Sequence, residues 1–320
     1  TKVLLQVFRK TESRTFPVTI VREEIRMQSV RAKLVEPGYG WLRVSQFQDR
    51  TVEDFVGKLA DLYKQDANLK GIVLDLRNDP GGLLEASVAI SAAFLPEDVT
   101  VVSTNGQIAE SKAVFKASPE FYARRGGDPL RKLPAALKSV PLVVLVNEGS
   151  ASASEIVAGA LQDHKRAVIM GSQTFGKGSV QTVRQLGPDT ALKITTARYY
   201  TPNGRSIQAT GIVPDIWLDE TADGNVFSAL RTREADLEKH ISSGQGGDAK
   251  HPARDKARQE ALKKLKEANK AAGGDKDKAP KPLPEFGTPE DFPLQQALNQ
   301  LKGKPVVVSK TQVERKAEAD

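Results

Sequence analysis

Hydrophobic and polar residues follow one another along the chain in blocks that predict alternating strands and helices. Three short apolar runs, 71–76, 141–147 and 167–170, read as buried strands. After the first two, a turn of small or polar residues leads into apolar positions at helical spacing, over 84–94 and 154–162. Strand, turn and helix in this order predict an α/β fold with a largely parallel sheet.

Weaker patterns surround this core. Two apolar runs at 3–8 and 16–21 predict a hairpin across the polar turn 9–14. Further strands are expected over 26–35, 39–47, 99–104, 179–186, 190–200 and 206–209. An amphipathic helix is predicted to begin at Thr51, with its apolar face on Val52, Phe55, Val56, Leu59 and Leu62. The polar stretch 105–133 predicts a surface excursion or a flap on the substrate side.

The C-terminal third differs in composition. Residues 231–240 are compatible with a helix, and 242–284 are rich in Lys, Ala, Gly, Asp and Pro, which predicts a flexible linker carrying a solvated helix over 254–271. Beyond it, 292–301 place Leu294, Leu298 and Leu301 on one helical face, and 306–309 form a short β-like run. Such a face either folds back on the core or docks on another subunit. We favour self-association through this segment.

Composition narrows the classes of function. Hydrophobic residues make up 39% and charged residues 27%, and no apolar run approaches the roughly 18–20 residues of a membrane span. The net charge is +7, but basic and acidic residues are interleaved along the chain, which favours a solubilising surface over nucleic-acid binding. The sequence has no cysteine, which excludes disulfides and thiol catalysis. Its three histidines are scattered, so we expect neither a metal site nor a cofactor.

Candidate chemistry lies at the turn after 141–147. This turn carries Ser150, Ser152 and Ser154 at the start of a helix, where unpaired N–H groups and the helix dipole can stabilise an oxyanion. A serine needs a base, and Lys177, flanked by glycines, can serve if burial lowers its pKa. The alternative is that the serines only turn and cap the helix while Lys177 is solvated.

Four blocks, 74–90, 149–161, 174–181 and 194–216, resemble the carboxyl-terminal processing proteases, also called tail-specific serine proteases. The resemblance spans roughly half the chain. It implies that Ser152, the middle serine of S-A-S-A-S, is the nucleophile and that Lys177 is the general base. It further implies that Gln181 orients the lysine. The N–H groups of Gly82 and Ala153 would form the oxyanion hole, although Gly81 and Gly82 remain hard to tell apart.

The same resemblance implies the architecture and setting. The expected core, residues 26–240, is similar to the crotonase and ClpP proteins, and residues 1–25 would be the last strands of a PDZ domain. A flexible linker, 241–284, and a helical segment, 285–320, would follow. The family acts on protein or peptide substrates near their C-termini and is exported, so a periplasmic or otherwise extracytoplasmic location is expected. A homo-oligomer and an adaptor protein are further possible partners, with no membrane span in this chain.

Three alternatives compete with this interpretation. The run 171–177 matches the opening of a P-loop, but Gly178 stands where Ser or Thr is needed, and the next residues read as a strand instead of a helix. A Ser-His-Asp triad with His164 fails because twelve residues of helix would separate it from Ser152 by roughly 18 Å, and Asp163 fails with it. The third is a catalytically inactive relative that binds a peptide or other ligand on the same fold.

Overall fold

We describe the protein from a computed structural model of residues 1–320, which describes all of them except 24–27, 124–126, 226–229, 246–251, 273–282 and 311–320. The helices and strands in chain order are β1 (Lys2–Arg9), β2 (Arg14–Val21), β3 (Val30–Glu36), β4 (Tyr39–Val44), α1 (Thr51–Gln65), β5 (Gly71–Asp75), α2 (Leu84–Phe94), β6 (Thr100–Gly106), β7 (Ala113–Lys116), α3 (Pro119–Tyr122), β8 (Leu142–Val146), α4 (Ala153–Asp163), β9 (Val168–Gly171), β10 (Ser179–Gly187), β11 (Thr190–Tyr200), β12 (Ile216–Trp217), α5 (Pro252–Ala272) and α6 (Phe292–Leu301).

The centre of the fold is a six-stranded sheet in the order β12-β9-β8-β5-β4-β3. All neighbouring pairs run parallel except β3 and β4, which are joined by a tight turn and run antiparallel. Every residue of β5 and β8 is buried, as expected for strands covered on both faces. The predicted α/β class is therefore confirmed, whereas the likeness to crotonase and ClpP remains a prediction.

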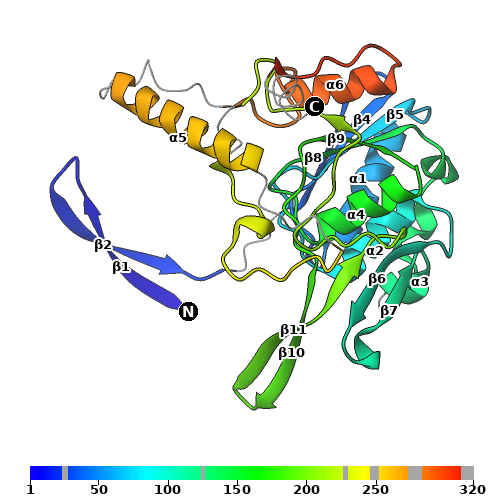
Figure 1. The fold of residues 1–320 in the computed structure, drawn as a ribbon, viewed down its shortest axis with the longest axis horizontal. Coiled ribbons are helices and arrows are strands. Elements are labelled where there is room, and N and C mark those ends of the chain that lie inside the picture. The colour runs from blue at the N-terminus through cyan, green and yellow to red at the C-terminus, as the bar shows by residue number, and fades with distance from the viewer. Residues whose placement is uncertain (24–27, 124–126, 226–229, 246–251, 273–282, 311–320) are drawn as a thin grey trace.

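Alternate side chains of the central strands pack into two separate hydrophobic cores, one on each face of the sheet. Leu74 and Val144 point to the face covered by α1, α2 and α4, where Phe55 of α1 and Val157 of α4 are fully buried. Val73 and Leu145 point to the opposite face, which is covered by α6 (Figure 1). The alternation follows from the two-residue period of a strand.

Helix α6 folds back on its own chain, while self-association through this segment stays a prediction. Its residues Leu294 and Leu298 are 1% and 2% exposed, packed on Trp41, Val73 and Met170 of the chain's own sheet. These leucines pack on the sheet of their own chain, because the face that carries Trp41, Val73 and Met170 would otherwise be exposed to water. Leu301, the third leucine of that face, is half-buried against the same cluster.

A second sheet of four antiparallel strands, β10-β11-β6-β7, stands beside the first. The predicted excursion 105–133 supplies its edge strand β7 and the short helix α3. Hairpin β10–β11 extends from the body of the molecule (Figure 1). Three weak sequence predictions are wrong: 206–209 forms only a single bridge to Tyr200, 231–240 only a 3-10 turn at Glu234–Asp236, and 306–309 no strand.

The N-terminal strands β1 and β2 form the predicted hairpin and, among the described residues, pair only with each other. Their assignment to a PDZ domain remains a prediction. Helix α5 confirms the helix expected inside the charged linker, and parts of that linker, 246–251 and 273–282, lie outside the described residues. Among the described helices, none is both long and apolar enough to cross a membrane.

Candidate active site

The serine-rich elbow is the turn between β8 and α4. Ser152 is the N-cap residue of α4, with φ 56° and ψ −110°. A positive φ is uncommon for a residue with a side chain and costs on the order of 1–3 kcal/mol, so the surrounding structure must hold it. The Ser152 hydroxyl makes no capping hydrogen bond and the residue is half-buried, so this hydroxyl stays available.

The two neighbouring serines hold the elbow in place. Ser150 and Ser154 are fully buried. The Ser150 hydroxyl donates to the carbonyl of Leu76 at 2.8 Å, and the Ser154 hydroxyl donates to the carbonyl of Asp79 at 3.0 Å. The Ala151 N–H donates to the same Asp79 carbonyl at 2.9 Å. Of these three serines, only Ser152 combines an unbound hydroxyl with access to solvent, and its role as nucleophile stays a prediction.

The loop after β5, residues 76–82, packs directly on this elbow. A side chain at Gly81 would bring its Cβ within 2.8 Å of both the Ala153 nitrogen and the Ser152 Cβ. Gly81 donates its N–H to Asp79 Oδ1 at 2.8 Å, and its carbonyl accepts from Phe47 at 3.0 Å. Both polar groups of the Gly81 backbone are therefore used.

Gly82 is different. A Cβ at Gly82 would lie 1.9 Å from the Phe47 carbonyl oxygen, so no other residue fits this approach. Gly82 forms a parallel bridge with Phe47. The Phe47 N–H donates to the Gly81 carbonyl and the Phe47 carbonyl accepts from the Leu83 N–H, so the N–H of Gly82 faces away from Phe47. Gly82 is exposed, and within the described residues neither its N–H nor that of Ala153 has a hydrogen-bond acceptor.

The backbone that carries Lys177 is fixed by hydrogen bonds. The N–H of Phe175 donates to the carbonyl of Ser150 at 3.0 Å, which joins the lysine loop to the serine elbow. The N–H of Gly178 donates to the side-chain oxygen of buried Gln208 at 3.0 Å. The Lys177 side chain itself is exposed. The pocket expected around this amine is therefore not closed in this structure.

Glu155 is the residue that sequence reasoning missed. Its carboxylate is fully buried and accepts four hydrogen bonds, from the N–H groups of Ser152 (2.8 Å), Gly176 (2.6 Å) and Lys177 (2.9 Å) and from the Thr174 hydroxyl (2.5 Å). One side chain thus ties the serine backbone to the lysine backbone. The Ser-x-x-Glu spacing at the start of α4 is a capping-box signature that could have revealed it.

Burial raises the pKa of Glu155 to about 7, while its four donors act in the opposite direction. Burial likewise raises the pKa of Asp79 to about 7, with a smaller lowering by the Gly81 N–H. Both carboxyl groups hold backbone that shapes the candidate site. Their protonation state near neutral pH therefore bears directly on the geometry of the elbow.

Comparison with known proteins gives this geometry a context. Residues 38–218, more than half of the chain, match Peptidase family S41. The chain belongs to peptidase family S41. It is 40% identical over 251 residues to a carboxy-terminal-processing protease of Bartonella bacilliformis, and 38% identical over 219 residues to one of Synechocystis. These alignments cover 78% and 67% of this chain but 54% and 47% of the relatives, so the chain spans about half their length.

Solved structures agree with the family assignment. A photosystem II D1 C-terminal processing protease is 31% identical with a TM-score of 0.50, covering 70% of this chain and 57% of that one. A putative S41 protease from Bacteroides fragilis has a TM-score of 0.52, covering 83% of this chain and 66% of that one, and at 16% identity it supports the fold alone.

In this S41 chain the structure does not bring Gln181 to Lys177. Gln181 lies on β10 directly opposite Thr195 of β11, and its amide donates to the Thr195 hydroxyl at 2.6 Å. Both residues are exposed or near the surface of the protruding hairpin. No hydrogen bond from the lysine amine to the Gln181 side-chain oxygen is present among the described residues, because the strand pairing turns this side chain along the hairpin.

The rival sites find no support in the S41 fold. Lys177 is followed by strand β10, whereas a P-loop requires a helix. His164 lies at the opposite end of α4 from Ser152 and its Nε2 is 2.7 Å from the carbonyl of Thr100. Asp163 accepts hydrogen bonds from Asn203 and Arg205 at that same far end. Among the described residues, no cluster of His, Cys, Asp and Glu could hold a metal.

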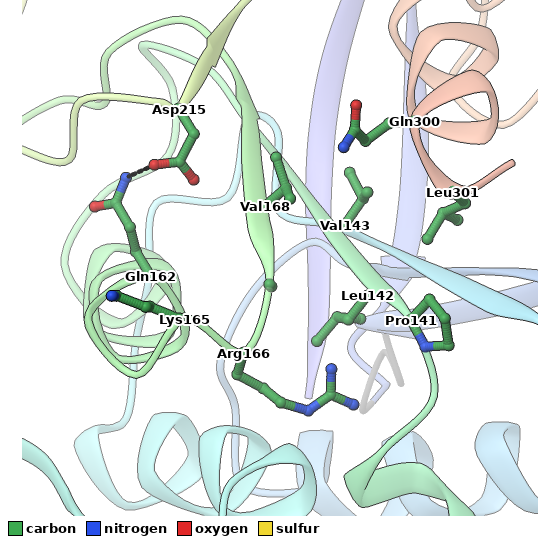
Figure 2. A pocket seen from close by; sticks show the side chains of 11 residues that line it. Pro141, Leu142, Val143, Gln162, Lys165, Arg166, Val168, Asp215, Gln300 and Leu301 are labelled. Atoms are coloured by element: carbon green, nitrogen blue, oxygen red, sulfur yellow. Dashed lines mark hydrogen bonds between the residues drawn. The ribbon is translucent and has the colours of Figure 1, made fainter. Parts of the chain in front are cut away.

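An open pocket of about 430 Å³ lies away from the elbow (Figure 2). It opens at the start of β8 and the end of α4, which puts it roughly 16 Å from Ser152 along the eleven residues of the helix. Among its polar groups, Gln162 donates to Asp215, and the Arg166 guanidinium donates to backbone carbonyls.

Proposed function

We propose that this S41 chain is the catalytic part of a serine endopeptidase that cleaves protein substrates near their C-termini, with Ser152 as nucleophile and Lys177 as general base. The observation that supports it best is the position of Ser152. Its free hydroxyl lies at a left-handed elbow beside the unbound N–H groups of Gly82 and Ala153, and Glu155 ties that elbow to the lysine loop.

The proposed chemistry follows from these groups. A neutral Lys177 amine removes the proton of the Ser152 hydroxyl as its oxygen attacks the scissile carbonyl carbon. The N–H groups of Gly82 and Ala153 donate to the oxyanion that forms. Lys177 then gives its proton to the leaving amine of the substrate. In the second step the neutral Lys177 amine deprotonates a water molecule, which hydrolyses the acyl-enzyme.

The proposal requires two side-chain movements, one of Lys177 and one of Gln181. Lys177 is exposed, whereas a general base must lie within hydrogen-bond reach of the serine. The backbone on both sides of Lys177 is bound to Glu155 and Gln208, so the amine reaches Ser152 by rotating its own side chain. Substrate covering the site would exclude water from the amine and favour its neutral form. Gln181 would have to leave Thr195 to orient it.

Ser152→Ala tests the proposal. The variant removes one oxygen from a half-buried hydroxyl without a capping bond, so it should keep the wild-type unfolding temperature while losing cleavage of casein. Lys177→Arg keeps a positive charge but cannot give up its proton, so it should be equally inactive. Undiminished cleavage by either folded variant would rule out its role. A wild-type protein that binds C-terminal peptides but never cleaves them would instead favour the inactive, ligand-binding relative.

The setting of the enzyme is part of the same proposal. The curated relatives are named as carboxy-terminal-processing proteases, and we extend that substrate class to this chain. We further propose an extracytoplasmic location and a homo-oligomer, with an adaptor protein as a possible partner. Size-exclusion chromatography with light scattering tests the oligomer directly, and a mass equal to that of one chain would exclude it.

A further inference from the structure

A buried charge network joins the C-terminal segment to the loop that carries Gly82. Arg77 lies at the start of this loop, and its side chain is 3% exposed. Its guanidinium donates two hydrogen bonds to Asp75, at 2.9 and 2.6 Å, and two to Asp291, at 2.8 and 2.7 Å. The side chains of Asp75 and Asp291 are 0% and 2% exposed. Arg77 is therefore held by two carboxylates in paired, forked contacts.

Asp291 comes from a part of the chain far away in sequence. It lies 214 residues after Arg77, at the N-cap of α6, and outside the 38–218 span that matches the family. Its carboxylate also accepts from the N–H of Gly287 at 2.7 Å. Phe286, from the same segment, stacks on the Arg77 guanidinium with 4.1 Å from the carbon to the ring centre. The segment thus covers Arg77 from two sides.

The network leads directly to the candidate oxyanion groups. Asn78, the residue after Arg77, has φ 54° and exchanges hydrogen bonds with Asn147 at the end of β8, at 2.9 and 2.8 Å. Asp79 binds the elbow through its carbonyl and Gly81 through its carboxylate. Four residues, 78–81, separate Arg77 from Gly82, and their backbone is irregular. Its shape therefore depends on what fixes its first residue.

We propose that Asp291 is a positioning residue for this loop, so that docking of the C-terminal segment 285–301 on Arg77 sets the orientation of the Gly82 N–H. This rests on the proposed function only in treating Gly82 as an oxyanion donor. The charges explain why the contact is specific. Arg43, whose side chain is 14% exposed, approaches Asp75 at 3.3 Å, so two cations and two carboxylates balance in a buried cluster.

Neutralising Asp291 breaks this balance. Burial by itself would lower the pKa of Arg77, and the two carboxylates raise it above its usual value, so the guanidinium stays charged. With Asn in place of Asp291, an amide NH₂ faces one guanidinium N–H, so the buried cation loses one of its four hydrogen bonds and one of its two carboxylate charges. Arg77 can then relax toward Asp75 and shift the backbone that follows it.

The test compares Asp291→Asn with a matched control on the same helix, Leu298→Ala. Leu298 packs α6 on the sheet but has no part in the charge network. Asp291→Asn should lower kcat for peptide cleavage by at least about tenfold, less than the 10²–10³ of losing an oxyanion donor, with KM within about twofold. Leu298→Ala should lower the unfolding temperature yet keep kcat within about twofold. Equal kcat losses in both variants would mean that α6 contributes stability alone.

A second measurement does not depend on activity. Amide hydrogen exchange of the 76–83 segment should be faster in Asp291→Asn than in wild type and unchanged in Leu298→Ala. If wild type cleaves nothing, the proposed function fails, and exchange alone decides the positioning role. If Asp291→Asn does not fold, Phe286→Leu removes the stacking on Arg77 while keeping an apolar side chain, and should accelerate the same exchange. Wild-type exchange at 76–83 in every folded variant of the network overturns the inference.

Discussion

Glu155→Gln separates the stability of the candidate site from its activity. Each oxygen of Glu155 accepts two donors: Oε1 those of Thr174 and Gly176, and Oε2 those of Ser152 and Lys177. Glutamine keeps one acceptor oxygen and places an NH₂ group where the other was. At least one backbone N–H then faces another donor, and the elbow and the lysine loop lose their common anchor.

The expected change in stability is small. A pKa raised from 4.5 to about 7 makes ionised Glu155 about 3 kcal/mol less favourable, relative to its neutral form, in the folded than in the unfolded chain. Glutamine removes this penalty at pH 8, while an unpaired buried N–H costs about 1–3 kcal/mol. The two effects nearly cancel, so the free energy of unfolding should stay within about 2 kcal/mol of wild type. Activity should fall by about 10²-fold, because a misplacement near 1 Å has that effect.

The pH dependence has a defined sign. Because the folded pKa of Glu155 is raised, its neutral form contributes stability that is complete below pH 4.5 and is lost as the pH rises through about 7. Activity should change in the opposite direction, since only ionised Glu155 accepts from all three N–H groups. The wild-type kcat/KM should therefore fall as the pH drops through about 7, and the contribution of Glu155 to that fall should be missing from the residual activity of Glu155→Gln.

The assay is cleavage of a fluorescent casein between pH 5.5 and 9, with thermal unfolding of each variant at the same pH. Glu148→Gln is the matched control. Burial also raises the pKa of Glu148, which pairs with Arg231 at 3.3 Å. Unlike Glu155, it does not accept from the N–H groups of Ser152, Gly176 or Lys177, so the kcat/KM of Glu148→Gln should stay within a few-fold of wild type. Wild-type kcat/KM and an unchanged pH profile in folded Glu155→Gln would refute the anchoring role.

Further predictions concern the loop, the hairpin and the C-terminal helix. Burial raises the pKa of Asp79 from 3.8 to about 7, so Asp79→Asn should unfold at a higher temperature than wild type at pH 8, and this gain should shrink as the pH falls below 7 and vanish only below pH 3.8. Thr195→Val removes the partner that holds Gln181 along the hairpin and should leave cleavage intact or raise it, whereas Gln181→Ala should lower it if the amide orients Lys177. Leu298→Ala should lower the free energy of unfolding by about 2–5 kcal/mol while light scattering gives an unchanged mass. A lower mass would show that α6 also supports an oligomer.

Local pattern was sufficient to predict the central elements. The strands around 71–76 and 141–147 and the helices after them followed from apolar runs and turn residues, because neighbouring residues determine both signals. The same pattern predicted a reactive serine at an elbow before α4. The structure adds the reason for choosing Ser152: the hydroxyls of Ser150 and Ser154 are already bound to the carbonyls of the neighbouring loop.

The sequence could not determine contacts between distant segments. The apolar face of 292–301 predicts burial, but the sequence does not say against what. The structure shows that this helix covers the sheet face that carries Val73 and Leu145 of the same chain. The strand register of β10 and β11 places Gln181 beside Thr195, and no local pattern encodes that pairing.

Long-range charge pairing shows the same limit most clearly. Asp291 and Arg77 are 214 residues apart, and either one alone reads as an ordinary charged residue at the end of an element. The sequence by itself determined which residue types stand at the turns and which runs are buried. The tertiary structure alone decided that Glu155 joins the serine and lysine loops, and that a C-terminal carboxylate neutralises Arg77. The physical reason is that a buried charge is stable only beside a partner, and the folded chain alone decides which residue that partner is.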